Sequence, residues 1–319
     1  MDAARLSLLR ELGDRGSVAA VAEALRVSPS AVSQQLSALQ SSVPVPLTTK
    51  RGRRLVLTEA GEALAVAASR VEQALAEARA TVDSFHGRTE RPVGVAAFHS
   101  AGLALFGPLV AEIGDRARLA LVDADVPREE FPGLTADHDL VIAHRLAHDP
   151  EWPRERHRVF PLLVEPLDIA LHEDHPLARR DRISPEDLRD QRWISTHERF
   201  PLAGVLRHLG GLIGQTPRID HRINEFSVAA QVVRSGAAIA VMPRFTAAPL
   251  ATDGMVLRPL AGQPVVRHVD VLARPESLAH TSVRAVLEAL RTVASRASAA
   301  DRFGREDTVD GKGHIHAPL

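Results

Sequence analysis

The stretch Ser28-Pro-Ser-Ala-Val-Ser-Gln-Gln-Leu-Ser-Ala-Leu39 decides how the first part of this chain folds. Ser28 can cap a helix, because its hydroxyl can accept a hydrogen bond from a free amide of the first turn, and Pro29 suits the first helical position. We expect the helix to run to about Gln40. Apolar residues share one of its faces and small polar residues share the other. The apolar face holds Val32, Leu36 and Leu39, and the polar face holds Ser30, Ser33, Gln34 and Ser37.

Two more helices are predicted before this one. Ser17 can cap a helix that ends near Leu25, and only Arg26 and Val27 separate it from the next helix. Two helices with so short a joint are typical of a helix-turn-helix. An earlier helix with apolar residues at helical spacing would close a small three-helix core. Its apolar positions are Leu6, Leu9 and Leu12.

Positive charge follows the polar-faced helix. No acidic residue lies between Glu23 and Glu59, and Pro44 and Pro46 prevent the helix from continuing. The basic run 50–54 followed by the apolar run 55–57 predicts a turn into a strand, which would form a wing. Because the formal net charge is only -1, attraction to nucleic acid must rest on this local charge.

This arrangement predicts a surface that grips a phosphate backbone and reads bases. Short polar side chains fit a major groove, and Gln34 and Gln35 are the candidates for base edges. The wing arginines would contact phosphates or a minor groove. Each feature taken singly favours a plain amphipathic helix beside a solvated loop, whereas their combination and order favour DNA binding. The predicted DNA contacts are Ser28, Ser30, Ser33, Gln34, Gln35, Ser37, Lys50, Arg51, Arg53 and Arg54.

A long helix is predicted from Glu59 to about Phe85, because proline is absent there and alanine is abundant. Its apolar residues advance by alternating steps of four and three, which gives the 3.5-residue period of helices that pair. Pairing with a second subunit is the favoured interpretation, and packing against its own domain stays open. The predicted dimerisation residues are Leu64, Val71, Leu75, Val82 and Phe85.

The segment 28–40, followed by Lys50-Arg-Gly-Arg-Arg-Leu-Val-Leu-Thr-Glu-Ala-Gly61, resembles the winged helix-turn-helix of LysR-type transcriptional regulators. Thr58-Glu-Ala-Gly61 matches the Leu-Thr-x-Ala-Gly signature of that family. The chain departs from the family at Val43-Pro44, which stands for a Leu-Gly step, and at Leu47-Thr48, which stands for a Leu-Phe pair. An aromatic packing contact before the wing is therefore missing.

The resemblance extends to about residue 297 and implies a sensor domain like periplasmic binding proteins, whose chain crosses twice between two lobes. It also implies subunit pairing through the linker helix and a tetramer that pairs dimers through the sensor domains. From the residues alone, short apolar runs that alternate with helical stretches beyond residue 92 predict an open α/β sheet. The predicted strands are 93–98, 119–122, 140–143, 167–171, 193–196, 218–223 and 237–242, and the predicted helices are 101–113, 202–213, 227–235 and 283–294.

The expected fold class is therefore α/β overall, with an N-terminal winged helix-turn-helix, a long linker helix and a two-lobed effector domain. The expected boundaries are 1–58 for the DNA-binding domain, 59–87 for the linker helix and 92–297 for the effector domain. Lobe I comprises 92–163 and 266–297, lobe II comprises 164–265, and 298–319 form a disordered tail.

A small molecule is expected where strands end. Ligands of open α/β sheets bind beyond the carboxyl ends of strands, near helix N-termini. The first strand runs into His99 and Ser100, and the strand 193–196 repeats this arrangement in the second lobe. The resemblance implies that Ser100 and Thr196 touch the effector, while the alternative is that both only cap helices. His144 and Phe226 are further candidates for the cleft.

Signatures of hydrolases, phosphate loops, dinucleotide-binding loops and zinc proteases are absent from the sequence, so we expect no enzyme, cofactor or metal. His172-Glu-Asp-His175 has metal-like spacing but resembles the family's His-Pro-Leu loop. The chain has no cysteine, no export signal and no apolar run of membrane-spanning length, which predicts a cytoplasmic protein.

The expected partners are double-stranded promoter DNA, an unidentified small-molecule effector and further copies of the chain, as a dimer of dimers. The competing hypothesis is a cytoplasmic solute-binding or enzymatic α/β protein with an accessory helical domain. A third hypothesis is a regulator whose sensor has lost its ligand and acts only as a scaffold.

Overall fold

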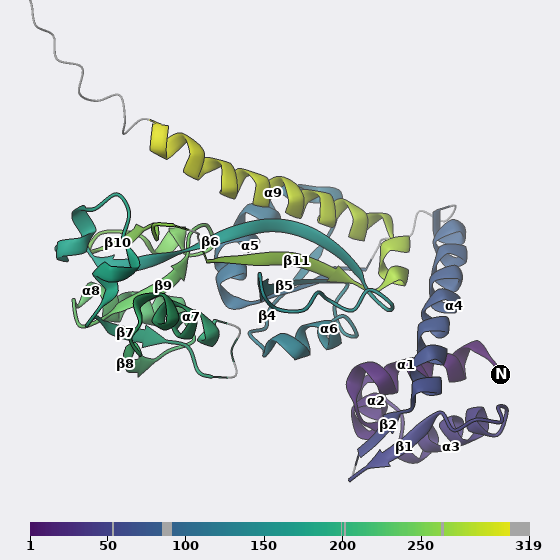
Figure 1. The fold of residues 1–319 in the computed structure, drawn as a ribbon. Coiled ribbons are helices and arrows are strands. Elements are labelled where there is room, and N and C mark those ends of the chain that lie inside the picture. The colour runs from purple at the N-terminus through teal and green to yellow at the C-terminus, as the bar shows by residue number, and fades with distance from the viewer. Residues whose placement is uncertain (53, 85–90, 199, 201, 263–264, 307–319) are drawn as a thin grey trace, which may run out of the picture.

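The computed structural model describes residues 1–52, 54–84, 91–198, 200, 202–262 and 265–306. Helices α1 (Ala3–Arg15), α2 (Val18–Leu25) and α3 (Pro29–Gln40) pack together with the hairpin of β1 (Thr48–Arg51) and β2 (Arg54–Leu57), as Figure 1 shows. The predicted helix-turn-helix and wing are both present. Their shared core consists of Leu9, Leu12, Val21, Ala22, Val32, Leu36, Leu39 and Leu47.

Local hydrogen bonds explain where these helices begin. The hydroxyl of Ser17 accepts from the amide of Ala20 at 3.1 Å, and that of Ser28 accepts from the amide of Ala31 at 3.2 Å. Although Thr48 stands where the family has phenylalanine, Leu47 beside it is buried in the domain core. In addition, the Gln40 Oε1 accepts from the Leu47 amide at 2.7 Å, which fixes the loop before β1.

The linker helix α4 (Glu59–Ser84) has the predicted length, and it packs against both α1 and the short helix η6 (Pro275–Ala279) of the effector domain. The first half of α4 packs within its own chain, where Leu64 contacts the core of the DNA-binding domain and Ala68 is buried. The alternative of packing against its own chain is therefore correct there. Farther along, Val71, Leu75 and Val82 are 36%, 37% and 58% exposed, and Phe85 lies outside the described residues.

The strands of the effector domain follow the order β4-β3-β5-β11-β6-β9-β7-β8, with β10 paired to β6. β6 carries the chain from lobe I to lobe II, because its residues 158–166 pair with β11 and residues 167–172 pair with β9 or β10. β11 carries the chain back to lobe I. The two crossings lie close to the predicted positions, residues 163 and 266. The bounds are β3 Val93–Ala97, β4 Leu119–Asp123, β5 Leu140–Leu146, β6 Arg158–His172, β7 Arg192–Ser195, β8 Arg218–Arg222, β9 Ile239–Pro243, β10 Met255–Arg258 and β11 Val266–Ala273.

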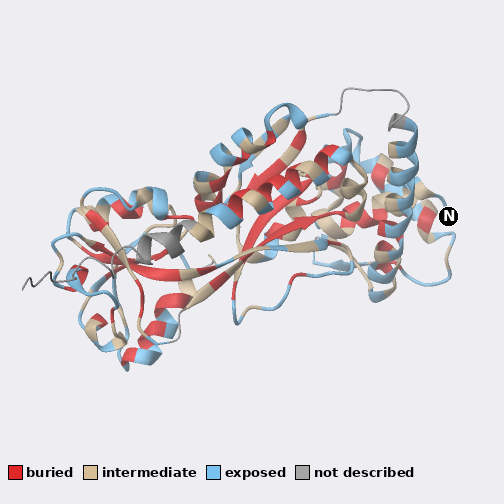
Figure 2. Cartoon of the chain, turned by 90° about the horizontal axis from the view of Figure 1, so that it is seen from above, coloured by how far each residue is buried: buried red, intermediate tan, exposed pale blue. Residues whose placement is uncertain are grey.

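Helices cover the strands, and in Figure 2 the buried residues follow the strands while exposed residues line the outer helical faces. The first half of β6 escaped prediction because Pro161 and Pro166 interrupt it, and proline usually argues against an inner strand. The remaining helices are α5 His99–Ile113, α6 Phe131–Leu134, α7 Ala203–Ile213, α8 Phe226–Arg234 and α9 Thr281–Glu306, with the 3-10 helices η1 Gly114–Arg116, η2 Arg128–Glu130, η3 Pro176–Arg179, η4 Pro185–Leu188 and η5 Ala248–Leu250.

The expected disordered tail from residue 298 is wrong in its first part. Helix α9 continues to Glu306, and residues 307–319 lie outside the described residues. The reason lies in composition, because the segment 297–306 is rich in alanine and arginine, which favour a helix.

Candidate DNA-reading surface and effector cleft

The polar face of α3 is turned to solvent. Ser30, Ser33, Gln34 and Ser37 are exposed, whereas the apolar residues of the same helix are buried in the domain core. The helix therefore presents short donors and acceptors on a surface that its own chain leaves uncovered. This is the geometry that entry into a major groove requires.

The side chains of three predicted base or backbone contacts, Ser28, Ser30 and Gln35, already have partners among the described residues. The Ser28 hydroxyl caps α3 and lies 2.9 Å from the Ser30 hydroxyl. The Gln35 Oε1 accepts from Arg5 Nε at 3.1 Å, which leaves Gln34 as the freer glutamine. The sequence did not single out Arg5, because it lies on α1, outside the acid-free window, and its contact with α3 is tertiary.

The wing carries its charges at the tip of the hairpin. Lys50, Arg51 and Arg54 are exposed, and Arg51 pairs with Arg54 across a turn at Gly52 that has a φ of 60°. The sequence had suggested that Lys50 and Arg51 lie in the turn, but both belong to strand β1. Arg53 lies outside the described residues.

All five predicted effector residues line one cavity between the lobes. His99, Ser100 and His144 come from lobe I, and Thr196 and Phe226 come from lobe II. The cavity has a volume of only about 30 Å³, which leaves room for little more than ordered water. The sequence missed its other lining residues, which are Phe98, Asp125, Phe200, Leu202, Asn224 and Arg267.

The expected helix caps at the cleft are incorrect. Helix α5 begins at His99, and Ser100 is a buried residue inside it whose hydroxyl accepts from Arg267 Nη2 at 3.1 Å. In lobe II, β7 ends at Ser195 and α7 begins only at Ala203, so the strand does not lead directly into a helix.

A buried ion pair forms the floor of the cleft. Glu165 on β6 and Arg267 on β11 are almost fully buried, and Arg267 Nε lies 2.7 Å from Glu165 Oε2. The other carboxylate oxygen of Glu165 accepts from the amides of Phe245 and Thr246 at 2.7 and 2.5 Å. This network joins both crossing strands to lobe II, and through Ser100 it reaches α5.

A histidine bridges the lobes at the cleft mouth. His99 Nδ1 lies 2.6 Å from Asp123 Oδ2 in lobe I, and His99 Nε2 lies 2.7 Å from Glu225 Oε2 in lobe II. The neighbouring Asp125 has its pKa raised to about 6, mainly by partial burial, which the charge of His99 opposes and those of Asp123 and Glu225 reinforce.

Two buried polar atoms of the cleft have no partner among the described residues: His144 Nδ1 and Thr196 Oγ1. Burial, together with the charge of Arg267, holds the pKa of His144 well below its usual value, so the ring is neutral near pH 7. It packs against the rings of Phe98 and Phe131, with centroids 4.4 and 5.7 Å away. A ligand or an ordered water in the cleft could supply the hydrogen bonds that these two atoms lack.

A larger groove, of about 500 Å³, lies between α7 and β8 on lobe II. It is built from one lobe only, so movement of the lobes would neither open nor close it. The interlobe cavity is the better candidate because residues from both lobes and two unpaired buried atoms meet there.

In the described ranges, no group of three or more His, Cys, Asp or Glu side chains is placed to hold a metal ion. The His172 Nδ1 accepts from the Asp174 amide, and the His175 Nδ1 accepts from the Leu177 amide. These histidines thus stabilise a loop. No helix in the described part of the chain is long and apolar enough to cross a membrane.

Comparisons with known proteins agree with this geometry. The family "Bacterial regulatory helix-turn-helix protein, lysR family" matches residues 4–62, and "LysR substrate binding domain" matches residues 86–295. The transcriptional regulator CbbR of Xanthobacter flavus is 28% identical over 287 residues, which cover 86% of this chain and 83% of that protein.

Two solved structures share the fold. Full-length OxyR of Pseudomonas aeruginosa superposes with a TM-score of 0.63 at 19% identity and covers 91% of this chain and 95% of its own. LysG of Corynebacterium glutamicum, solved with bound effector arginine, superposes with a TM-score of 0.59 at 21% identity. The match covers 93% of this chain and 99% of LysG. The match is to a family of regulators and not of enzymes, which disfavours the solute-binding or enzymatic alternative. This chain belongs to the LysR family of bacterial DNA-binding transcriptional regulators, with a winged helix-turn-helix and an effector-binding domain.

Proposed function

We propose that this regulator binds promoter DNA through α3 and the wing and responds to a small molecule held between its lobes. The observation that carries the proposal is the uncovered polar face of α3 beside the exposed basic hairpin. Such a protein acts where the bacterial chromosome lies, which favours the cytoplasm.

The DNA contacts divide into two roles. Gln34 is placed to read a base edge, because its amide is free and at the centre of the exposed face of α3. Lys50, Arg51 and Arg54 are placed to contact phosphates or a minor groove, where they add affinity that depends on salt. Ser28, Ser30, Ser33 and Ser37 would contact the backbone or fill the groove.

The effector would be held by residues of both lobes. His144 Nδ1, in a neutral ring, can accept a hydrogen bond, and Thr196 Oγ1 can donate or accept one. Arg267 is already paired with Glu165. At the cleft mouth negative charge predominates, because Asp123 and Glu225 share a single ion-pair partner among the described residues, the ring of His99. This balance favours an effector with a cationic group that lies near Asp125 and replaces the His99 bridge when the lobes open.

Oligomerisation would use the exposed half of the α4 stripe. Val71, Leu75 and Val82 lack cover in the single chain and repeat at the spacing of paired helices. On α5, Leu103 and Val110 are also exposed apolar residues, seven positions apart on one face, and they suit a second contact through the effector domain. A dimer would place two α3 helices on the halves of an inverted repeat, and two such contacts would give a dimer of dimers.

Genome-wide mapping of bound sites followed by gel shifts tests the proposal. We expect selective binding to a short inverted repeat in promoter DNA at moderate salt, with a scrambled duplex as the control. Equal affinity for both duplexes would contradict promoter recognition. Small molecules made or used by the products of the neighbouring genes would then be screened by calorimetry against the full chain and the Asp125→Asn variant.

A further inference from the structure

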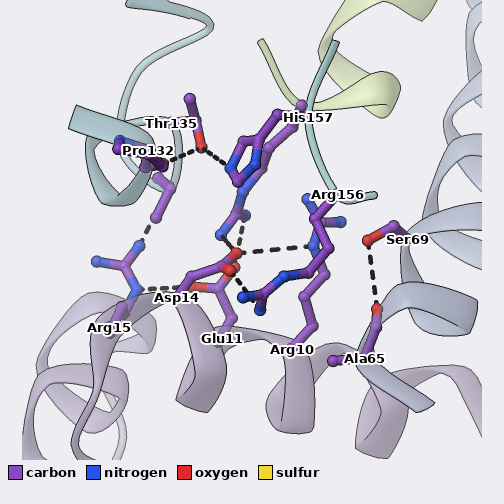
Figure 3. A network of polar contacts seen from close by, with 12 residues as sticks. Arg10, Glu11, Asp14, Arg15, Ala65, Ser69, Pro132, Thr135, Arg156 and His157 are labelled. Carbon is purple, nitrogen blue, oxygen red and sulfur yellow. Dashed lines mark hydrogen bonds and ion pairs between the residues drawn. The ribbon is translucent and has the colours of Figure 1, made fainter. Parts of the chain in front are cut away.

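The DNA-binding domain is docked on lobe I by charged residues that are largely buried. Arg274 of lobe I donates to Glu11 and to Asp14 of α1, at 2.6 Å each. Arg10 Nη1 lies 2.7 Å from Glu276 Oε1, and Arg156 Nη1 lies 2.9 Å from Asp14 Oδ1. Figure 3 shows the α1 side of this cluster facing Arg156 and His157.

This contact fixes an orientation. Although burial lowers the pKa of Arg274, the charges of Glu11 and Asp14 outweigh it and raise the pKa, so the guanidinium stays charged. Buried ion pairs gain little net stability over apolar packing, but each requires a specific geometry. The buried small residues Ala65, Ala68 and Ser69 of α4, which packs against η6, add close packing beside the ion pairs.

The docked arrangement leaves the reading face of α3 open, because its polar residues are exposed in the same structure. Docking therefore does not block DNA. Instead it connects the DNA-binding domain to lobe I, which offers a route from the cleft to α3 through lobe I.

Helix α6 supplies a direct connection between the cleft and α1. On one side of α6, Phe131 packs edge-on against His144 and Phe98, at centroid distances of 5.7 and 6.4 Å. Both of these residues line the cleft. A ligand that moves either ring must therefore shift Phe131 or open a void beside it, because packed interiors do not deform freely.

The segment just after α6 contacts α1 through polar groups. Arg15 of α1 donates to both carboxylate oxygens of Asp137, at 3.0 and 2.8 Å, and to the carbonyl of Ala136 at 3.1 Å. The Thr135 hydroxyl lies 3.1 Å from His157 Nε2. A crevice of about 700 Å³ lies beside these groups, so α1 and this segment meet at discrete polar contacts and not over a continuous apolar face.

We propose that α6 and the Arg15–Asp137 pair transmit the state of the effector cleft to the DNA-binding domain. The proposal rests on the proposed function, since it needs both DNA binding and a cleft that opens. Thermodynamic linkage makes it testable without the effector: if the cleft influences DNA binding, then DNA must influence the cleft equally.

The test uses the lack of cysteine in the chain. A Thr196→Cys variant of the full chain places a thiol in the cleft, and its reaction rate with dithionitrobenzoate reports how often the lobes open. The rate is measured alone, with the promoter duplex identified by site mapping, and with a scrambled duplex of equal length. The same measurement is made after adding Asp137→Ala or, as control, Asp115→Ala, an exposed lobe I carboxylate that is not in the contact.

We expect the promoter duplex to change the labelling rate about fivefold or more in the parent and the Asp115→Ala protein, in line with typical coupling between sites. In the Asp137→Ala protein the change should fall below twofold while gel-shift affinity persists, because Asp137 is 56% exposed and its loss spares the fold. Binding without any rate change in the parent, or an unchanged effect in Asp137→Ala, would overturn this inference alone. Absence of selective DNA binding in the parent would overturn the proposed function and the inference with it.

Discussion

The carbonyl oxygen of Leu47 occupies the space that a Cβ atom on Gly61 would need. The contact would lie far inside van der Waals distance, and the carbonyl carbon of Leu47 would be only 3.1 Å away. Gly61 lies in the first turns of α4, where its amide donates to the Thr58 hydroxyl at 3.1 Å, and that hydroxyl donates to the Pro46 carbonyl at 2.7 Å. The glycine of the Thr-x-Ala-Gly signature thus lets the linker helix pack directly on the backbone of the loop just before β1.

Replacing Gly61 with alanine should therefore destabilise the DNA-binding domain. The obstacle is backbone and cannot swing aside, so we expect a loss of about 3 kcal/mol in the free energy of unfolding, at the upper end for overpacking. Urea unfolding of the full chain measures it. Gly107→Ala is the matched control, because Gly107 lies on α5 with open space around its Cβ position. That change should stabilise by about 0.5 to 1 kcal/mol, and an equal loss in both variants would contradict the steric explanation.

Gln34 and Arg54 should differ in how they affect DNA binding. Gln34→Ala should lower affinity for the preferred duplex by about 1 to 3 kcal/mol and leave affinity for a scrambled duplex unchanged, because it removes base contacts only. Arg54→Ala should weaken binding to both duplexes and reduce the slope of log affinity against log salt by about 1. Fluorescence anisotropy at several salt concentrations separates the two. Loss of selectivity from the Arg54 change would show that the wing reads bases.

Breaking the buried ion pair of Glu165 and Arg267 under the cleft should strongly destabilise the protein. In Arg267→Met the Glu165 carboxylate stays buried without its cation, and we expect about 3 to 5 kcal/mol of lost stability. The double variant Arg267→Met, Glu165→Gln removes both charges and should regain a large part of it. Thermal unfolding of the three proteins checks this, and a double variant no more stable than Arg267→Met would mean that the hydrogen bonds, and not the charge, dominate.

Local signals in the sequence were enough to predict the DNA-binding domain. Ser17 and Ser28 cap their helices as expected, because a cap depends on residues three positions away. Only the second half of strand β6 was predicted. Its first half contains Pro161 and Pro166, which argue against a strand, and forms a strand because it pairs with β11. The five cleft residues were placed together by the rule that ligands meet strand ends and by the resemblance to the family, which implied Ser100 and Thr196.

Contacts between residues distant in sequence were out of reach. Arg267 gave no signal because its partners Glu165 and Ser100 lie on other elements. The same holds for Arg274, whose partners Glu11 and Asp14 are more than 250 residues away on α1. Charge pairs of this kind leave no periodic pattern, so the docking of the two domains could not be predicted from the sequence alone.

The pH dependence of stability should report the buried His144. Its folded-state pKa is lowered from an ordinary 6.5, so the folded protein binds its proton less readily than the unfolded chain does. Its contribution to stability is therefore complete above pH 6.5 and is lost as the pH falls from 6.5 towards the folded pKa. Each such proton gives a slope of about 1.4 kcal/mol per pH unit. His157, whose pKa burial also lowers, adds to the slope in the same direction.

Asp125 changes the stability of the fold in the opposite direction, over a lower range of pH. Its folded pKa of about 6 lies above the ordinary 3.8, so its contribution is lost as the pH rises from 3.8 to about 6. Urea unfolding at pH 7.5, 6.5 and 5.5 should thus show a net loss on acidification that His144→Phe reduces by one proton's slope, since phenylalanine keeps the contacts with Phe98 and Phe131 but does not titrate. If the slope of His144→Phe equalled that of the parent, His144 would have to be protonated or exposed in the folded chain, and its assignment as a neutral acceptor in the cleft would fail.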